Sequence, residues 1–379
     1  MVGAGTRLPT PAIAFDVTPL QNAHRHRGIG TYVLGLARRL AAQTEVPIEF
    51  WGWAGDGAFE VPPPHRILHL RRYPTPEYRG AWLFAQLAMK RRSALSSVRV
   101  VHLTDPDALT TLRHRHVMAT VYDLIPLREG VSPRRPLVWA GYGTYLHALR
   151  RVETIFAISQ QTAADVVDLL GVPAEKIVVA APGIDLSPQE NVSDDISTNE
   201  ARPYFLFLGG PNPNKNLAVL LDAMAICTEL PEELRIAGHW LPQQVAALDR
   251  DLQARGLRDR SRFVGFVPGA DLPGLMKHAT AVVVPSRMEG FGLPVGEGLA
   301  AGAVVVHSRI PVLEETSAGA ALTFDPSSAD ELARNLRRAA GDLNLNSNLR
   351  QRGVRRAKEL TWDVAVERTL AAYRAMLGR

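Results

Sequence analysis

The sequence predicts an α/β protein built from two Rossmann-like domains that face each other across a cleft. Short apolar runs rich in valine, isoleucine and alanine alternate with helical patterns, which is typical of parallel sheets buried on both faces. A polar, acidic segment at residues 188–203 interrupts this alternation, which then starts again. Ligands of such sheets bind at the carboxyl ends of the strands, so we expect the cleft to be the binding site.

Residues 1–187 contain the elements of the first predicted domain. The expected strands lie at 12–17, 98–102, 117–122, 154–158 and 177–180, and the expected helices at 29–42 and 161–170. Most of these strands are apolar throughout, so helices are expected to cover both faces of their sheet.

Residues 204–360 repeat the pattern and form the second predicted domain. Its expected strands lie at 204–208, 234–237, 262–264, 281–284 and 303–306, and its expected helices at 215–228, 241–255, 271–278 and 294–301. The tail from residue 329 on is expected to be mostly helical, with a break near 341–348. We expect segment 361–379 to be a helix that packs back on the first domain.

The composition indicates where in the cell the protein is expected. The chain has one cysteine, Cys227, which excludes an internal disulfide framework and a zinc site made of several thiolates. A reducing cytoplasm is therefore the expected location. No run of about 18 apolar residues is present, so we expect no membrane-spanning helix.

The excess positive charge lies in the front half of the chain. Residues 1–190 contain 21 lysines and arginines against 16 aspartates and glutamates, whereas the remainder contains 22 of each. This asymmetry favours an anionic partner. A helical run ending in Lys90-Arg91-Arg92 fits either contact with the inner face of the plasma membrane or a solvated helix end. Nucleic acid is not expected, because no aromatic stacking motif accompanies the charges.

The segment from Glu289 to Glu297 is the most informative motif. A buried-looking strand runs into a glycine-rich loop with Gly290 and Gly292, and Pro294 stands where a helix should begin. Free amides at a helix start favour an anion, and carboxylates accept hydrogen bonds from hydroxyls. The pattern indicates a polyol next to a phosphate; a plain βα turn is the alternative.

A second turn joins a strand to a helix at Gly209-Gly210-Pro-Asn-Pro-Asn-Lys215. Lys215 would place a cation over the helix start, and Asn212 or Asn214 could cap that helix. The spacing is not that of a P-loop. A solvated lysine after a turn is the alternative interpretation.

Two loops of the front half could complete the site. Gly28 and Gly30 open a helix and would let the backbone approach a phosphate, although a lone Gly-x-Gly is a weak dinucleotide signal. Tyr122 and Asp123 follow a strand, where they could bind a polar ligand or simply form a turn. Asp105-Pro-Asp107 could hold a hard cation, but a turn is favoured there.

Together these motifs resemble the retaining glycosyltransferases of family 4, which have the GT-B fold of two Rossmann-like domains. The resemblance covers about Asp16 to Trp362, and its most specific part is Glu-Gly-Phe-Gly-Leu-Pro-x-x-Glu at 289–297. Ala181-Pro-Gly-Ile-Asp185 supports it at the domain hinge. The bacterial mannosyl- and rhamnosyl-type transferases of surface polysaccharides are the most similar subgroup.

The resemblance implies a role for each motif. Glu289 would bind the donor sugar and Glu297 the ribose hydroxyls, while Lys215 would pair with the diphosphate. The remaining implied donor-site residues are Gly28, Gly30, Gly209, Gly210, Phe266, Gly290, Phe291, Gly292 and Leu293, with Phe266 beside the base. Tyr122 and Asp123 would contribute to the catalytic centre from the acceptor domain.

The implied reaction moves a hexose or deoxyhexose, with mannose favoured, from a nucleotide-diphosphate sugar to a hydroxyl of a glycan, a lipid-linked glycan or a small molecule. The resemblance also implies no metal ion and no cofactor besides this donor. Gly210 and Asn214 stand where the family often has arginine, and Tyr122 where it often has histidine. A non-catalytic nucleotide-sugar-binding protein therefore stays open as an alternative. A nucleotide-sugar epimerase of similar fold is a further alternative, against which the pair Glu289 and Glu297 argues.

Overall fold

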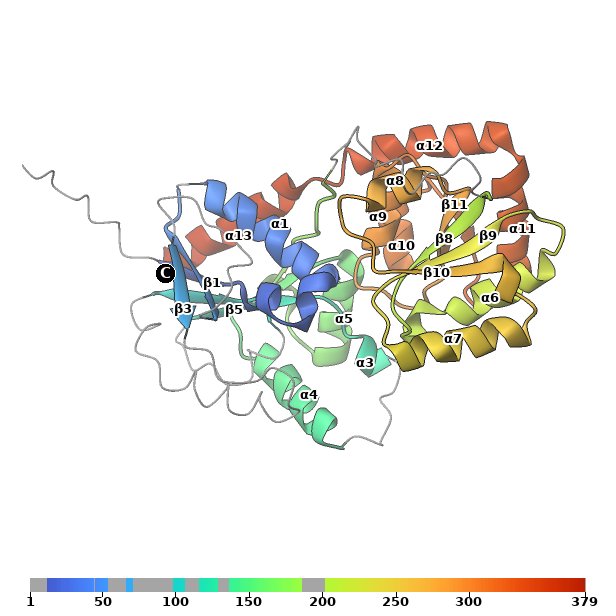
Figure 1. Cartoon of the computed structure of the whole chain (residues 1–379). Helices are drawn as coiled ribbons and strands as arrows, with labels where there is room; N and C mark the ends of the chain where they lie inside the picture. Colours follow the sequence, from blue (N-terminus) through green and yellow to red (C-terminus); the bar gives the residue numbers. More distant parts are fainter. Residues whose placement is uncertain are drawn as a thin grey trace, which may run out of the picture. The chain divides into compact units, whose positions relative to one another are not determined.

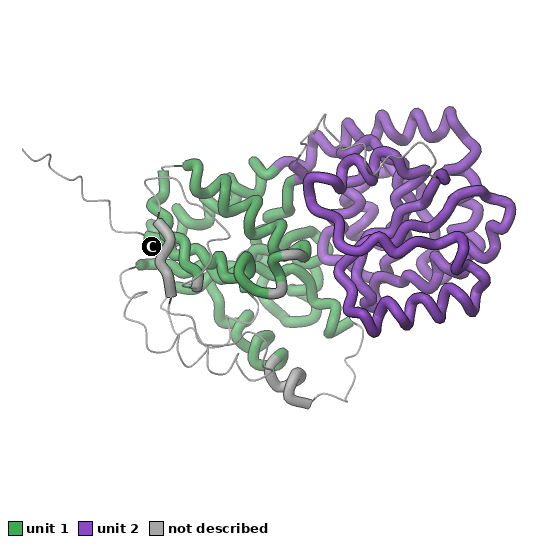
Figure 2. Tube along the Cα trace, viewed as in Figure 1, with its two compact units in different colours: residues 1–183, 362–379 green, residues 184–361 purple. Residues whose placement is uncertain are grey.

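The computed structural model describes residues 12–43, 45–53, 66–70, 98–105, 116–128, 136–185 and 202–378. The chain divides into two compact units, shown in Figure 2. Unit 1 comprises Met1–Gly183 and Trp362–Arg379, and unit 2 comprises Ile184–Thr361. Each unit contains a parallel sheet with helices packed on it (Figure 1), so the predicted pair of Rossmann-like domains is confirmed.

Unit 1 is built on a parallel sheet whose described strands follow the order β3-β2-β1-β4-β5-β6-β7. The strands are β1 (Ile13–Asp16), β2 (Ile48–Trp53), β3 (Arg66–Leu70), β4 (Val100–Leu103), β5 (Val117–Val121), β6 (Thr154–Ala157) and β7 (Ile177–Val179). Its helices are α1 (Gly28–Ala42), α3 (Ile125–Arg128), α4 (Pro136–Leu149), α5 (Gln160–Leu170) and α13 (Trp362–Leu377), with short 3-10 turns at Thr18–Gln21, Ala23–His26 and Ala174–Lys176. The strands β2 and β3 and the helix α4 were not predicted from the sequence.

Unit 2 repeats the architecture with the strand order β10-β9-β8-β11-β12-β13. Its strands are β8 (Tyr204–Leu208), β9 (Glu233–Ala237), β10 (Ser261–Gly265), β11 (Ala281–Val284), β12 (Val305–Ser308) and β13 (Leu322–Phe324). Its helices are α6 (Leu217–Ile226), α7 (Pro242–Ala254), α8 (Leu272–Lys277), α9 (Leu293–Ala300), α10 (Pro311–Ser317), α11 (Ala329–Gly341) and α12 (Leu343–Ala357), with 3-10 turns at Pro213–Lys215 and Arg258–Arg260.

The two faces of the unit 2 sheet carry different helices. Alternate strand residues such as Phe205 and Val283 pack with α6, α7 and α11 in one core. Their neighbours, such as Leu206 and Val282, pack with α8, α9 and α10 in a second core. Burial of both faces explains why the strands are continuously apolar. The helices α6 and α9 therefore begin at the same edge of the sheet but on opposite faces.

The C-terminal helix α13 belongs to unit 1, where two contacts hold it. Trp362 occupies the space left by Gly35 on α1, since a Cβ at Gly35 would lie 2.1 Å from the indole ring. The buried imidazole of His102 bonds Tyr373 Oη through Nδ1 at 2.6 Å and Thr120 Oγ1 through Nε2 at 2.9 Å. Burial lowers the pKa of His102 to about 3, so this imidazole is neutral and its role here is structural.

Several expectations fall on parts of the chain that the structure leaves undescribed. The proposed linker lies outside the described residues except for Arg202 and Pro203, and so do Lys90-Arg91-Arg92 and Asp107. The break expected near 341–348 was wrong in extent, because α12 already begins at Leu343 after the cap residue Asp342. In the described parts, no helix is long and apolar enough to cross a bilayer.

Candidate functional site

A lysine and a glutamate from two neighbouring loops form the centre of the candidate site. Lys215 follows β8 and Glu289 follows β11, and these strands pair directly. Lys215 Nζ lies 2.7 Å from Glu289 Oε1, and Ser286 donates its hydroxyl to the same oxygen at 2.7 Å. The side chains retain 22% and 10% exposure, so the pair is shielded but still open to a ligand. Among the described residues, no hydrogen bond to Glu289 Oε2 is formed.

The turn that carries Lys215 is fastened to the Glu289 loop by its asparagines. Asn216 adopts a left-handed conformation (φ 54°), and its side-chain amide donates to the carbonyls of Pro285 and Pro326. Asn214 donates to the Met288 carbonyl at 3.2 Å and accepts from the Arg287 amide at 2.8 Å through its own backbone carbonyl. The expectation that Asn212 or Asn214 caps the following helix was wrong, because α6 begins at Leu217 and neither side chain caps it.

The start of α9 offers backbone donors on the other side of Glu289. Gly292 is left-handed (φ 95°), and a Cβ there would meet Leu313 Cδ2 at 2.3 Å, so the tight turn requires glycine. The Phe291 side chain is buried, and its carbonyl accepts from Thr316 Oγ1. The amides of Phe291, Gly292 and Leu293 donate to no described residue. Adjacent free amides at a helix start attract a phosphate or a sugar oxygen.

Glu297 lies one turn into α9, where its carboxyl group is available to a ligand. No described residue donates a hydrogen bond to it or forms an ion pair with it. Burial raises the pKa of this carboxyl to about 7, because nothing in its surroundings offsets the loss of water. A half-buried carboxyl that keeps its acceptor capacity suits a pair of ligand hydroxyls.

Three further predicted residues lie on unit 2 loops. Gly209 packs closely, since a Cβ would lie 3.0 Å from the Phe207 ring, whereas the Cβ position of Gly210 is nearly open. Phe266 is 51% exposed and follows Gly265, which has a φ of 76°. Gly290 precedes the free amides at the start of α9. All these residues follow the carboxyl ends of their strands, as the sequence predicts.

In unit 1, Gly28 and Gly30 open α1 as expected, but they differ in exposure. Gly28 is exposed at the helix start. Gly30 is buried, and a Cβ there would lie 2.6 Å from the carbonyl oxygens of His24 and Arg25. Packing against the preceding 3-10 turn therefore accounts for glycine at this position.

Tyr122 and Asp123 follow β5, and both have partners within unit 1. The Tyr122 hydroxyl donates to the Thr104 carbonyl at 2.9 Å, and its ring packs edge-on against Tyr32. Burial raises the pKa of Tyr122 well above its ordinary value, so the phenol stays protonated. Asp123 Oδ1 accepts from the Ile125 amide at 3.1 Å, which starts α3. These contacts give Tyr122 a structural role within unit 1.

Sequence reasoning missed the residues that orient the main pair. Ser286 bonds Glu289, and the Ser308 hydroxyl at the end of β12 donates to the Ser286 carbonyl. Asn216 binds two carbonyls that are distant in the sequence. Serine and asparagine next to turns are common, so no pattern marks them. Their roles depend on which strands are neighbours.

The fold defines the class of protein: the chain has the GT-B architecture of solved sugar-transferring proteins. It superposes on a sucrose-phosphate synthase from Thermosynechococcus elongatus with a TM-score of 0.82 at 20% identity, covering 97% of this chain and 99% of that one. HepE from Anabaena, solved with UDP and glucose, gives a TM-score of 0.75 at 17% identity, covering 96% of this chain and 100% of HepE.

Two family models together account for residues 26–356. Glycosyltransferase Family 4 matches residues 26–188, and Glycosyl transferases group 1 matches residues 188–356. The chain therefore belongs to the group 1, family 4 glycosyltransferases, which confirms the resemblance seen in the sequence.

Curated relatives include several mannosyltransferases. The O-antigen chain mannosyltransferase B of Escherichia coli is 29% identical over 240 residues, which is 60% of this chain and 62% of the relative. A serotype-specific mannosyltransferase WbdA of the same species is 26% identical over 68% of this chain, which spans about a third of its length. A D-inositol 3-phosphate glycosyltransferase of Kribbella flavida is 26% identical over 92% of this chain and 90% of the relative.

Proposed function

We propose that this protein is a retaining glycosyltransferase that moves a hexose from a nucleotide-diphosphate sugar to an acceptor hydroxyl. The Lys215–Glu289 pair beside the free amides of α9 carries this proposal. It joins a cation, a carboxylate and helix-start donors within one group of loops. This is the set of groups that a sugar attached to a diphosphate requires.

The negative charge that develops on the departing diphosphate is the main problem in glycosyl transfer. The bond between the anomeric carbon and the β-phosphate oxygen breaks, and the bond to the acceptor oxygen forms. In our proposal Lys215 and the amides of Phe291, Gly292 and Leu293 stabilise the diphosphate as its charge grows. The acceptor proton passes to the released phosphate oxygen and from there to solvent.

Glu289 and Glu297 have separate roles in this scheme. Glu289, fixed by Lys215 and Ser286 through Oε1, binds the hydroxyls of the sugar through Oε2. Glu297 accepts the ribose hydroxyls, and Phe266 borders the base. The diphosphate charge is balanced by Lys215 and amides alone, so we propose that transfer needs no metal ion and no further cofactor.

Mannose is the sugar that we favour, because two of the curated relatives named above are mannosyltransferases. We propose that unit 1 binds the acceptor, which is a glycan, a lipid-linked glycan or a small molecule. A cytoplasmic enzyme, with peripheral membrane contact through its basic front half, fits a lipid-linked acceptor.

A panel of GDP, UDP, dTDP and ADP sugars tests this proposal. A thermal-shift screen identifies the donor, because a bound ligand stabilises the fold by mass action. The matching donor is then incubated alone and with candidate acceptors. Transfer, or slow hydrolysis that releases nucleotide, supports the proposal. An isomerised nucleotide sugar formed without acceptor supports the epimerase alternative, and binding without turnover supports a non-catalytic protein.

A further inference from the structure

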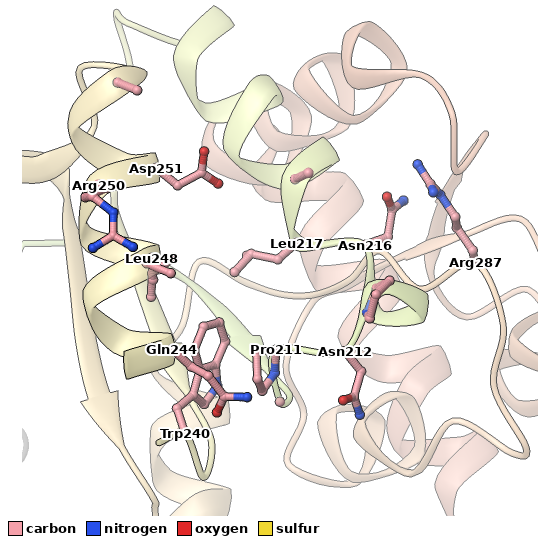
Figure 3. Close-up of a pocket in the computed structure, with 15 residues that line it drawn as sticks. Pro211, Asn212, Asn216, Leu217, Trp240, Gln244, Leu248, Arg250, Asp251 and Arg287 are labelled. Carbon is pink, nitrogen blue, oxygen red and sulfur yellow. The ribbon is translucent and has the colours of Figure 1, made fainter. Parts of the chain in front are cut away.

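A cavity of about 810 Å³ lies in unit 2, and Gly210 is the one predicted donor-site residue in its lining. It opens between α7 and the turn that leads into α6, as Figure 3 shows. Its volume falls within the range of about 300–1,000 Å³ that is typical of small-molecule sites. The cavity belongs to the α6–α7 face of the sheet, whereas Glu297 is on α9, which packs on the opposite face.

One wall of the cavity is an ordered apolar platform made by Trp240 and Pro211. The indole is fixed from two sides: its Nε1 donates to the Gly209 carbonyl at 2.8 Å, and its ring meets Phe263 edge-on at 5.7 Å. A rigid indole beside a proline ring offers a flat surface to the C–H face of a sugar. Asn212 and Gln244 add polar groups to the lining.

Two arginines give the cavity a net positive charge. Arg250 projects from α7 and Arg287 from the loop after β11, on opposite sides of the cavity in Figure 3. Neither guanidinium pairs with a carboxylate among the described residues. The acidic residue of the lining, Asp251, is neutralised by an ion pair with Arg255. Guanidinium groups bind phosphate and carboxylate oxygens, often in pairs.

We propose that this cavity binds an anionic sugar, a phosphorylated or uronate-containing saccharide, at a site separate from the donor site. The platform takes the apolar face of the sugar, and Arg250 takes the anionic group, while Arg287 adds positive charge on the other side of the cavity. The turn from Gly210 to Asn216 forms one wall of this cavity and also carries Lys215 towards Glu289. A ligand in the cavity would therefore contact the segment that positions Lys215. The proposal does not depend on sugar transfer.

The test is saturation-transfer-difference NMR on the full chain with mannose 6-phosphate and glucuronic acid as probes. Methyl α-mannoside and inorganic phosphate serve as the neutral and the sugar-free comparisons. We expect both anionic sugars to bind more tightly than either comparison. Saturating UDP and GDP should leave this binding intact, because Trp240, Gln244 and Arg250 of the cavity are not among the donor-site residues.

Two variants locate the binding. Arg250→Ala should weaken mannose 6-phosphate binding about tenfold, since a charged hydrogen-bond partner is lost. Ala247→Glu, which places a like charge in the lining, should weaken it at least as much. Arg334→Ala removes an exposed arginine of α11 outside the cavity and should change nothing. The proposal is overturned if the probes do not bind, if nucleotide displaces them, or if the two cavity variants behave like Arg334→Ala.

Discussion

Lys215 Nζ lies 2.7 Å from Glu289 Oε1, although 74 residues separate the two along the chain. Direct pairing of β8 with β11 brings their loops together, and the asparagines at 214 and 216 fasten one loop to the other. The pair therefore has a fixed geometry before any ligand contributes to it. This preorganisation is what stabilisation of a developing charge requires.

Replacing Lys215 should impair donor binding and turnover together. In our proposal Lys215→Ala removes the cation that faces the diphosphate, and loss of one such group costs about 10²–10³ in rate. Steady-state kinetics with the donor from the sugar panel measure this. Lys277→Ala, an exposed lysine on α8, is the matched control and should behave like the wild type. Unchanged kinetics in Lys215→Ala would remove this residue from the site.

Glu289→Gln should reduce turnover far more than stability. The amide keeps the size of the side chain and can still accept from Ser286, but the charge that faces Lys215 is lost. We expect turnover to fall by about 10²-fold or more, with a small shift in Tm. Turnover per folded molecule and the melting curve are measured on the same sample. A variant that unfolds but stays fully active when folded would contradict this role.

Glu297 should make stability depend on pH. Its pKa rises from 4.5 to about 7 on folding, so the folded protein holds a proton that the unfolded chain has already released. The wild type should therefore lose stability, relative to Glu297→Gln, as the pH rises from about 4.5 to about 7, with little further change above that. Urea unfolding of both proteins between pH 5 and 8 measures the difference. A constant difference would show that the carboxyl titrates normally.

The same carboxyl should make donor affinity depend on pH. The ionised form accepts hydrogen bonds from hydroxyls at both oxygens, so affinity for the donor nucleotide sugar should increase between pH 6 and pH 8. Glu297→Gln should bind weakly and without this rise. Calorimetric titration at several pH values provides the comparison, and an equally steep rise in both proteins would assign it to another group.

Gly292→Ala should destabilise unit 2 strongly. The residue has a φ of 95°, and the new methyl group would clash with Leu313 Cδ2 at 2.3 Å. Strain and overpacking together should cost about 2–4 kcal/mol. Gly256→Ala is the control: its φ is 68°, but nothing lies within 4 Å of its Cβ position, so about 1 kcal/mol is expected. Chemical denaturation of the two variants distinguishes the clash from the backbone strain.

The central strands were predictable because both of their faces are buried. The run Ala281–Val284 is apolar throughout and coincides with β11. The strands β2 and β3 were missed, since Glu49 interrupts the apolar run of β2 and charged or polar residues occur in β3. In α4, glycines and aromatic residues replace the usual amphipathic pattern, so periodicity did not reveal it.

The candidate site was likewise predictable only in part. Lys215, Glu289 and Glu297 could be selected because a cation and carboxylates stand beside glycine-rich turns, and the chemistry of such turns is local. The supporting contacts of Ser286 and Asn216 depend on strand order, which no local pattern encodes. The bond from the Tyr122 hydroxyl to the Thr104 carbonyl also depends on strand order, and its place after a strand did not reveal it.

Because α13 belongs to unit 1, the two units differ in the number of chain segments that form them. Unit 2 is one uninterrupted stretch, Ile184–Thr361, whereas unit 1 needs both termini of the chain. The chain enters and leaves unit 2 at adjacent points, where the Ile184 amide donates to the Leu360 carbonyl at 2.8 Å. Unit 2 can thus be exchanged with the matching segment of a relative as a single insert, without cutting unit 1 anywhere else. If unit 2 binds the donor and unit 1 the acceptor, as we propose, this exchange would recombine the two preferences.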